Sequence, residues 1–111
     1  MSIKDPVAPT LPLSEAQLAA ISAACSRHRV SRLYLFGSLL RPDYRPGESD
    51  IDLLVEFQPA EPAVLYKTYF SLLNELRQSL AAPIDLVMDD AIRNPYLQAS
   101  IEASKRMIYA A

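Results

Sequence analysis

Residues 50–57 read Asp-Ile-Asp-Leu-Leu-Val-Glu-Phe, and their alternation constrains the fold more than any other feature of the chain. Successive side chains of a β-strand point to opposite faces of a sheet, so even-numbered and odd-numbered residues separate here. One face is entirely apolar and carries Ile51, Leu53, Val55 and Phe57. The other carries three acids beside one leucine: Asp50, Asp52, Leu54 and Glu56. The pattern predicts a strand with one face in the core and an acidic opposite face.

Further short runs of apolar and β-branched residues predict strands at 30–36 and 84–88 and a small edge strand at 107–109. Helical signals separate them. Ser14 and Gln17 match a capping box and open a helix to about residue 29. Pro62 suits the first turn of a helix that Pro83 ends at about residue 82, and Asn94-Pro95 opens a last helix to about residue 105. This order predicts an α+β (α/β) domain with a small mixed sheet packed against helices.

The chain has 111 residues, half of them hydrophobic, which is enough for one core and too little for two typical domains. The first thirteen residues include prolines 6, 9 and 12 and are expected to form a flexible leader. Residues 14–111 are expected to form a single domain.

The formal net charge is −2, whereas proteins that bind nucleic acids usually carry a surplus of basic residues. We therefore expect no direct binding to nucleic acid. No apolar segment reaches the roughly 18 to 20 residues that span a bilayer, so no membrane insertion is expected. The single cysteine, Cys25, cannot form an intramolecular disulfide, which favours a reducing, cytoplasmic location.

The predicted strand at 84–88 places Asp85 on its polar side. If this strand neighbours the strand at 51–57, Asp50, Asp52 and Asp85 converge. Three adjacent carboxylates repel one another unless a cation neutralises them. Carboxylate ligands with open positions suit one or two Mg²⁺ ions, which bind protein carboxylates together with substrate phosphates. The three aspartates are therefore candidate metal ligands and catalytic residues for phosphoryl or nucleotidyl transfer.

The chain has two glycines, and both lie between the first two predicted strands. Gly37 directly follows a strand and allows the backbone to turn sharply and approach a ligand, and Ser38 adds a hydroxyl donor. Arg41 follows in the same loop and is suited to bidentate contact with phosphate. Gly37, Ser38 and Arg41 are the candidate nucleotide-binding residues.

The combination of Gly37-Ser38, an eleven-residue spacer, Asp50-Ile51-Asp52 and a later Ile84-Asp85-Leu86-Val87 resembles the signature of the polymerase-β-like nucleotidyltransferase superfamily. The chain most resembles its minimal nucleotidyltransferases, small stand-alone domains, and the resemblance covers roughly residues 18–109. It implies the polymerase-β-like fold.

The resemblance also implies an activity. Asp50, Asp52 and Asp85 would bind Mg²⁺, Asp85 would help to activate the acceptor hydroxyl, and Gly37 and Ser38 would hold the phosphates. The enzyme would move AMP from ATP onto a hydroxyl group. Many relatives are antitoxins encoded beside a HEPN-domain toxin, an RNase, and the family precedent is adenylylation of a tyrosine on that toxin.

Two other hypotheses remain open from the sequence. In one, the domain is a binding module that neutralises the toxin by direct contact, with catalysis weak or lost. In the other, it modifies a small molecule, and the acceptor pocket forms between subunits. Substitution of the paired aspartates separates the first alternative from an enzyme, because a binder would still neutralise the toxin.

Overall fold

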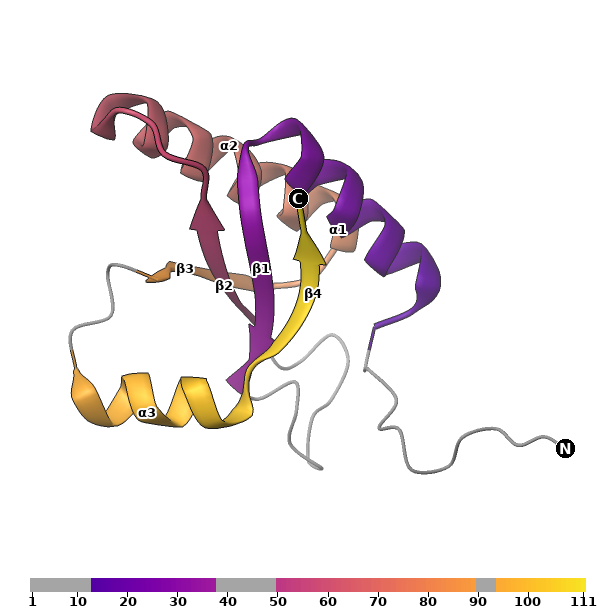
Figure 1. The fold of residues 1–111 in the computed structure, drawn as a ribbon. Coiled ribbons are helices and arrows are strands. Elements are labelled where there is room, and N and C mark those ends of the chain that lie inside the picture. The colour runs from indigo at the N-terminus through magenta and orange to yellow at the C-terminus, as the bar shows by residue number, and fades with distance from the viewer. Residues whose placement is uncertain (1–12, 38–49, 90–93) are drawn as a thin grey trace, which may run out of the picture.

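The computed structural model describes residues 13–37, 50–89 and 94–111. The predicted leader therefore lies outside the described residues except for Leu13. The elements follow in the order α1 (Glu15–Arg27), β1 (Val30–Phe36), β2 (Ile51–Phe57), α2 (Pro62–Leu80), β3 (Ile84–Met88), α3 (Pro95–Ser104) and β4 (Arg106–Ala110) (Figure 1). This arrangement confirms the predicted α+β class.

The described strands form a single mixed sheet in the order β3-β2-β1-β4. β1 pairs antiparallel with β2 and with β4, whereas β2 and β3 run parallel. Parallel neighbours need a long crossover connection, and α2 provides it here. The two strands that carry the candidate aspartates are therefore direct neighbours, as the sequence reasoning required.

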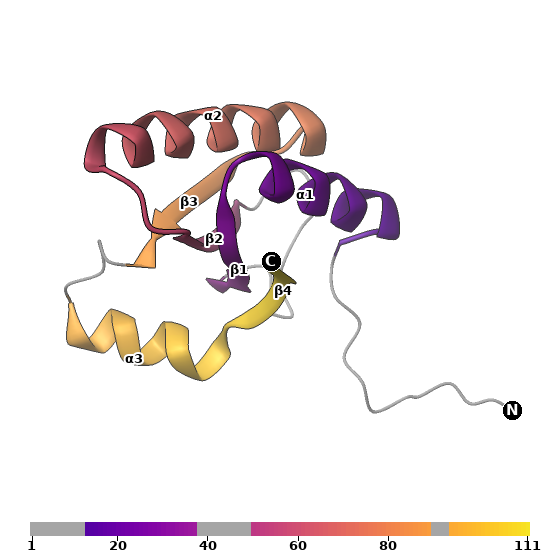
Figure 2. The same cartoon turned by 45° about the horizontal axis from the view of Figure 1, so that its top comes forward.

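The helices lie on both faces of the sheet. α1 and α2 cover one face, and α3 crosses the opposite face, as Figure 2 shows from a second direction. The main core lies between the sheet and the pair α1 and α2. Its fully buried side chains include Ile21, Leu33, Leu53 and Leu76. The odd-numbered apolar residues of β2 join this core, so the acidic face of β2 is the one that α3 crosses.

The predicted capping box opens α1. The backbone N–H of Gln17 donates to Ser14 Oγ at 3.0 Å, and the backbone N–H of Ser14 donates to Gln17 Oε1 at 2.8 Å. The helix ends at Arg27, two residues before the predicted end. Arg29 has a left-handed backbone with φ of 59°, which a helix cannot continue through.

α2 begins with Pro62 at its first turn and ends at Leu80, again two residues early. Its C-cap, Ala81, has φ of 50° and ψ of 43°, and its backbone N–H donates to the carbonyl of Arg77 at 3.0 Å. A left-handed cap satisfies a carbonyl at the end of the helix and turns the chain toward β3.

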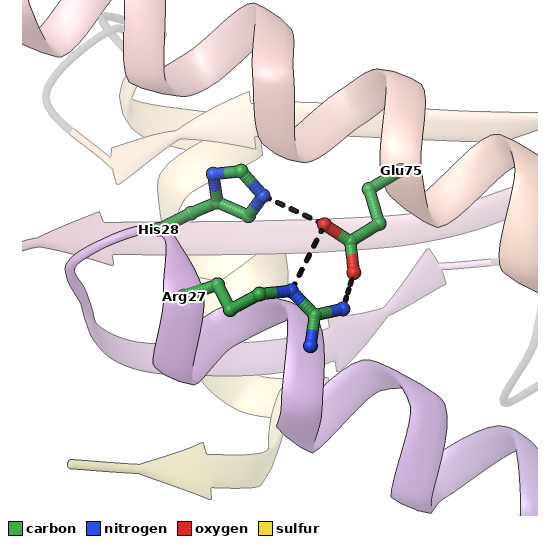
Figure 3. Close-up of polar contacts among 3 residues, drawn as sticks. All are labelled: Arg27, His28 and Glu75. Carbon is green, nitrogen blue, oxygen red and sulfur yellow. Dashed lines mark hydrogen bonds and ion pairs between the residues drawn. The ribbon is translucent and has the colours of Figure 1, made fainter.

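Glu75 of α2 ties the end of α1 to the second helix, as Figure 3 shows. Its carboxylate accepts hydrogen bonds from the Arg27 guanidinium, and Oε1 lies 2.8 Å from His28 Nε2. Burial, with a smaller effect of the Arg27 charge, lowers the pKa of His28 below its usual 6.5. A neutral imidazole can donate its Nε2–H to Glu75, so the link does not need a charged histidine.

None of the helices in the described residues is both long and apolar enough to cross a bilayer.

Candidate functional site

Asp52 and Asp85 occupy matching positions on neighbouring strands. The parallel register of β2 and β3 pairs Asp52 with Asp85 and Leu54 with Val87. Paired residues of a parallel ladder point to the same face of the sheet, so both carboxylates lie on the face opposite α1 and α2. The alternation along both strands predicts this convergence, and the register provides it for these two residues.

The start of β2 is fixed against the start of β3. The backbone N–H of Ile51 donates to the carbonyl of Pro83 at 2.9 Å, and this bond continues the ladder to the end of the sheet. Asp50 precedes Ile51 and is exposed, two positions before Asp52 on the chain. The carboxylates are therefore presented at the end of the sheet where β2 and β3 begin.

Gly37 follows the last residue of β1 and lies against Asp52. Phe36 is the register partner of Asp52 on β1. Gly37 has φ of 75°, and a Cβ placed on it would lie 2.2 Å from Asp52 Oδ2 and 3.0 Å from Cγ. No other residue fits this position without displacing the carboxylate, because real Cβ contacts are never so short. The chain thus needs glycine here for a left-handed turn and for a close approach to Asp52.

The other two predicted nucleotide-binding residues, Ser38 and Arg41, lie outside the described residues. Their predicted roles stay predictions. Gly37 is the described member of this group, and its contact with Asp52 joins the start of the predicted phosphate loop to the carboxylates.

The donor set suits a hard divalent cation. Mg²⁺ typically takes one or two protein carboxylates and completes its octahedron with water and substrate phosphates. Asp52 and Asp85 supply two carboxylates on one face, beside the glycine that opens space at Asp52. Among the described residues, no three His, Cys, Asp or Glu side chains are gathered as a metal-binding group. The predicted role of Asp50 as a third ligand therefore stays a prediction.

Tyr69 of α2 anchors β3 beside Asp85. Its hydroxyl donates to the carbonyl of Leu86, the residue after Asp85. Burial and the nearby Asp85 charge raise the pKa of the phenol, with Arg77 acting in the opposite direction, so the hydroxyl remains a donor. Because β3 is an outer strand of the sheet, this bond satisfies a carbonyl on its free edge and steadies the strand at the site.

A small groove lies on the same face, between the sheet and α3. It has a volume of about 60 Å³. The lining comes from β2, from the end of β3 and from α3: Leu54, Glu56, Asp89, Gln98, Ile101, Glu102 and Lys105. Leu54 follows Asp52 by two residues on the same strand face, so the groove adjoins the carboxylates.

Lys105 lines this groove. Its ammonium lies 3.0 Å from Glu102 Oε2 and 4.2 Å from the ring centroid of Tyr34. The hydrogen bond with Glu102 raises the pKa of Lys105, against a smaller opposing effect of burial. The sequence pattern does not predict Lys105, Tyr34 or the groove, because only the pairing of β1 with β2 and the position of α3 bring them together. The available signal is the alternation along residues 50–57, which places Glu56 on the same strand face as Asp52.

Comparison with protein families gives an independent result. The model of the family described as "Nucleotidyltransferase domain" matches residues 19–108. A candidate protein adenylyltransferase of Methanocaldococcus jannaschii is 38% identical over 76 residues, which is 68% of this chain and 74% of the relative.

Solved structures agree on the fold. A candidate minimal nucleotidyltransferase has a TM-score of 0.67 at 27% identity, covering 82% of this chain and 88% of that one. A structure described as a tri-AMPylated Shewanella oneidensis HEPN toxin in complex with MNT antitoxin gives a TM-score of 0.59 at 18% identity, covering 86% of this chain and 71% of that one. The predicted resemblance is thereby confirmed, and the chain belongs to the nucleotidyltransferase domain family.

Proposed function

We propose that residues 14–111 form a single, Mg²⁺-dependent nucleotidyltransferase domain that moves AMP from ATP onto a hydroxyl group of a partner protein. The expected acceptor is a tyrosine of a HEPN-domain toxin encoded by the adjacent gene, and the domain would act as its antitoxin. One observation carries the proposal: Gly37 touches the carboxylate of Asp52, whose register partner is Asp85. This contact places the start of the proposed phosphate-binding loop beside the paired carboxylates.

Each part of the site has a role in this reaction. Gly37, with Ser38 and Arg41 of the adjoining loop, would hold the phosphates of ATP through N–H groups and a guanidinium. Asp50, Asp52 and Asp85 would hold one or two Mg²⁺ ions, which supply positive charge to the phosphates and the leaving group. Asp85 would also accept the proton of the acceptor hydroxyl. These roles combine positioning with electrostatic stabilisation, as nucleotidyl transfer requires.

The chemical step balances without another reactant. The acceptor oxygen forms a bond to the α-phosphorus of ATP as the bond from that phosphorus to the bridging oxygen breaks. Pyrophosphate leaves, and the proton of the hydroxyl passes to Asp85. The products are an adenylylated protein and pyrophosphate.

Two findings about related proteins support a protein acceptor. The Methanocaldococcus jannaschii relative is named as a candidate protein adenylyltransferase, and the Shewanella oneidensis neighbour forms a complex with an AMPylated HEPN toxin. The described helices and strands are used to build one sheet and its supports. We therefore propose that a second protein presents the acceptor, and that the reaction takes place in the cytoplasm, where ATP and reduced thiols such as that of Cys25 are found.

The test is transfer of label from α-³²P-ATP, with Mg²⁺, to the HEPN-domain protein of the adjacent gene. Wild type is compared with Asp52→Asn and with Glu61→Gln, which removes an exposed carboxylate at the start of α2 on the other side of the sheet. We expect label with wild type and Glu61→Gln, and none with Asp52→Asn. Absence of label with all three, together with equal binding of the toxin, would establish a binding module instead. Label that appears on a small molecule alone would overturn the protein acceptor.

A further inference from the structure

The two paired carboxylates are held in place to different degrees. β2 is an inner strand that pairs with β1 on one side and with β3 on the other, so Asp52 is fixed from both sides. Gly37 also lies against its carboxylate. Asp85 lies on a five-residue outer strand, which among the described strands pairs with β2 alone. A short outer strand opens locally more readily than an inner one, so the position of Asp85 depends on further support.

Tyr69 of α2 gives β3 a second attachment. Its hydroxyl donates to the carbonyl of Leu86, the residue after Asp85, on the side of the strand that β2 leaves free. α2 can reach this edge because it forms the crossover between β2 and β3, on the face of the sheet opposite α3 (Figure 2). The bond therefore fixes the backbone next to Asp85 against a helix outside the sheet.

The ring of Tyr69 is itself held in place. It is half-buried and packs against the main core. The ring of Phe70 meets it edge-on, with centroids 5.1 Å apart and an interplanar angle of 84°. Farther along α2, the buried Leu72 and Leu76 fix the helix on the sheet. A tyrosine has few rotatable bonds, and a packed ring places its hydroxyl accurately, so this hydroxyl is a fixed point for the strand.

The charge of Asp85 also acts on this hydroxyl. Burial, and after it the Asp85 charge, raises the pKa of Tyr69, so the phenol and the carboxylate lie within electrostatic range of each other. The phenol stays protonated and can keep donating to Leu86. The bond and the carboxylate are therefore parts of one local arrangement at the outer edge of the site.

We propose that Tyr69 is a positioning residue for nucleotidyl transfer, whose hydroxyl holds β3 so that Asp85 keeps its place beside Asp52. The inference rests on the proposed transferase and adds a residue that acts through Asp85 without touching the substrate. A catalytic group must stay within about half an ångström of its productive position, and a misplacement of about 1 Å can lower a rate a hundredfold. Gly37 and Asp85 lie on opposite sides of Asp52, so loss of this support should disturb the proton acceptor more than the start of the phosphate loop.

The kinetic test compares variants of the full chain in transfer of label from α-³²P-ATP, with Mg²⁺, to the HEPN-domain protein of the adjacent gene. Tyr69→Phe removes the hydroxyl and keeps the ring. Tyr66→Phe removes an exposed hydroxyl from the same helix, and Ile21→Val removes one methylene from the core at α1, which lowers stability away from the site. At a temperature where all variants are folded, we expect Tyr69→Phe to lower kcat about tenfold and to change KM for ATP less than about twofold. Both controls should keep the wild-type kcat and KM.

Amide hydrogen exchange gives a second readout that needs neither nucleotide nor metal. A general loss of stability accelerates exchange throughout the sheet, whereas loss of a local support accelerates it where the strand opens. We expect exchange at residues 84–88 to accelerate several-fold more in Tyr69→Phe than in Ile21→Val. Exchange in β1 should change to the same extent in both variants.

The outcomes separate this inference from the proposed function. A wild-type kcat for Tyr69→Phe, or a loss of kcat that Ile21→Val shares, would overturn the positioning role. Exchange in β3 that responds equally to both substitutions would overturn it as well. If wild type transfers no label, the transferase is refuted, and exchange in β3 still decides whether Tyr69 holds the strand.

Discussion

Gly37 and Asp52 lie so close that a methyl group on the glycine would come within 2.2 Å of the carboxylate oxygen. The turn after β1 and the acid of β2 are consequently one structural unit. Any shift of the turn moves Asp52, and any side chain at position 37 displaces it. The first prediction follows from this contact.

We expect Gly37→Ala to lower transfer of AMP by about a hundredfold, because a misplacement of about 1 Å at a catalytic group has an effect of that size. Alanine is strained at the left-handed φ of 75°, so the variant should also have a free energy of unfolding that is lower by roughly 1 to 2 kcal/mol. Transfer of label and urea denaturation measure the two effects. Ser31→Ala, a small change on β1, the strand that precedes Gly37, is the control. Full activity of Gly37→Ala would contradict the prediction.

The hydroxyl of Tyr69 supports the strand that carries Asp85, through its bond to the carbonyl of Leu86. We expect Tyr69→Phe to reduce the free energy of unfolding by about 1 kcal/mol, the usual net effect of losing one hydrogen bond. The matched control is Tyr66→Phe, at an exposed site on the same helix, with a change of at most a few tenths of a kcal/mol. Equal stabilities of the two variants in urea would show that the bond contributes nothing.

Much of this fold could be predicted because its signals are local. The capping box of Ser14 and Gln17, Pro62 at a helix start and the alternation along residues 51–57 each act over a few residues, and each is present in the structure. The ends of α1 and α2 were predicted two residues late. Arg29 and Ala81 adopt left-handed conformations there, and neither residue type signals such a conformation.

The site was only partly predictable, because its geometry depends on long-range pairing. The sequence suggested that Asp52 and Asp85 share a face if the strands that carry them are neighbours. The parallel pairing of β2 with β3 meets that condition. It contained no signal for the contact of Gly37 with Asp52, which depends on the antiparallel pairing of β1 with β2. It also gave no indication that α3 crosses the acidic face, since Ile101 is the one buried residue of this helix and a single buried residue leaves no periodic stripe.

The lowered pKa of His28 predicts how stability depends on pH. Burial and the Arg27 charge disfavour the imidazolium in the folded state, while Glu75 faces the ring and is itself engaged by Arg27. The unfolded chain, with a pKa near 6.5, therefore binds the proton more readily. The neutral His28 side chain therefore contributes fully to stability above pH 6.5. This contribution decreases as the pH falls below 6.5 toward the lower pKa of the folded state.

We expect the melting temperature of wild type to fall more than that of His28→Gln between about one pH unit above and about one unit below 6.5. Gln keeps a side-chain N–H that can reach Glu75 but cannot titrate in this range. Glu15→Gln, at an exposed acid in the first turn of α1, controls for a general effect of removing a titratable group. Parallel pH profiles for wild type and His28→Gln would disprove the role of the histidine.

The last prediction concerns the end of α2, where Ala81 carries a side chain in a conformation that suits glycine. With φ of 50° and ψ of 43°, its Cβ crowds the following carbonyl. We expect Ala81→Gly to raise the free energy of unfolding by roughly 0.5 to 1 kcal/mol, after the greater freedom of glycine in the unfolded chain is subtracted. Ala63→Gly, inside the same helix, should instead lower it by up to about 1 kcal/mol. The midpoints of urea denaturation distinguish the two variants, provided that the unfolding free energy depends on urea concentration with the same slope in both. A loss of stability in both variants would show that the left-handed cap is not strained.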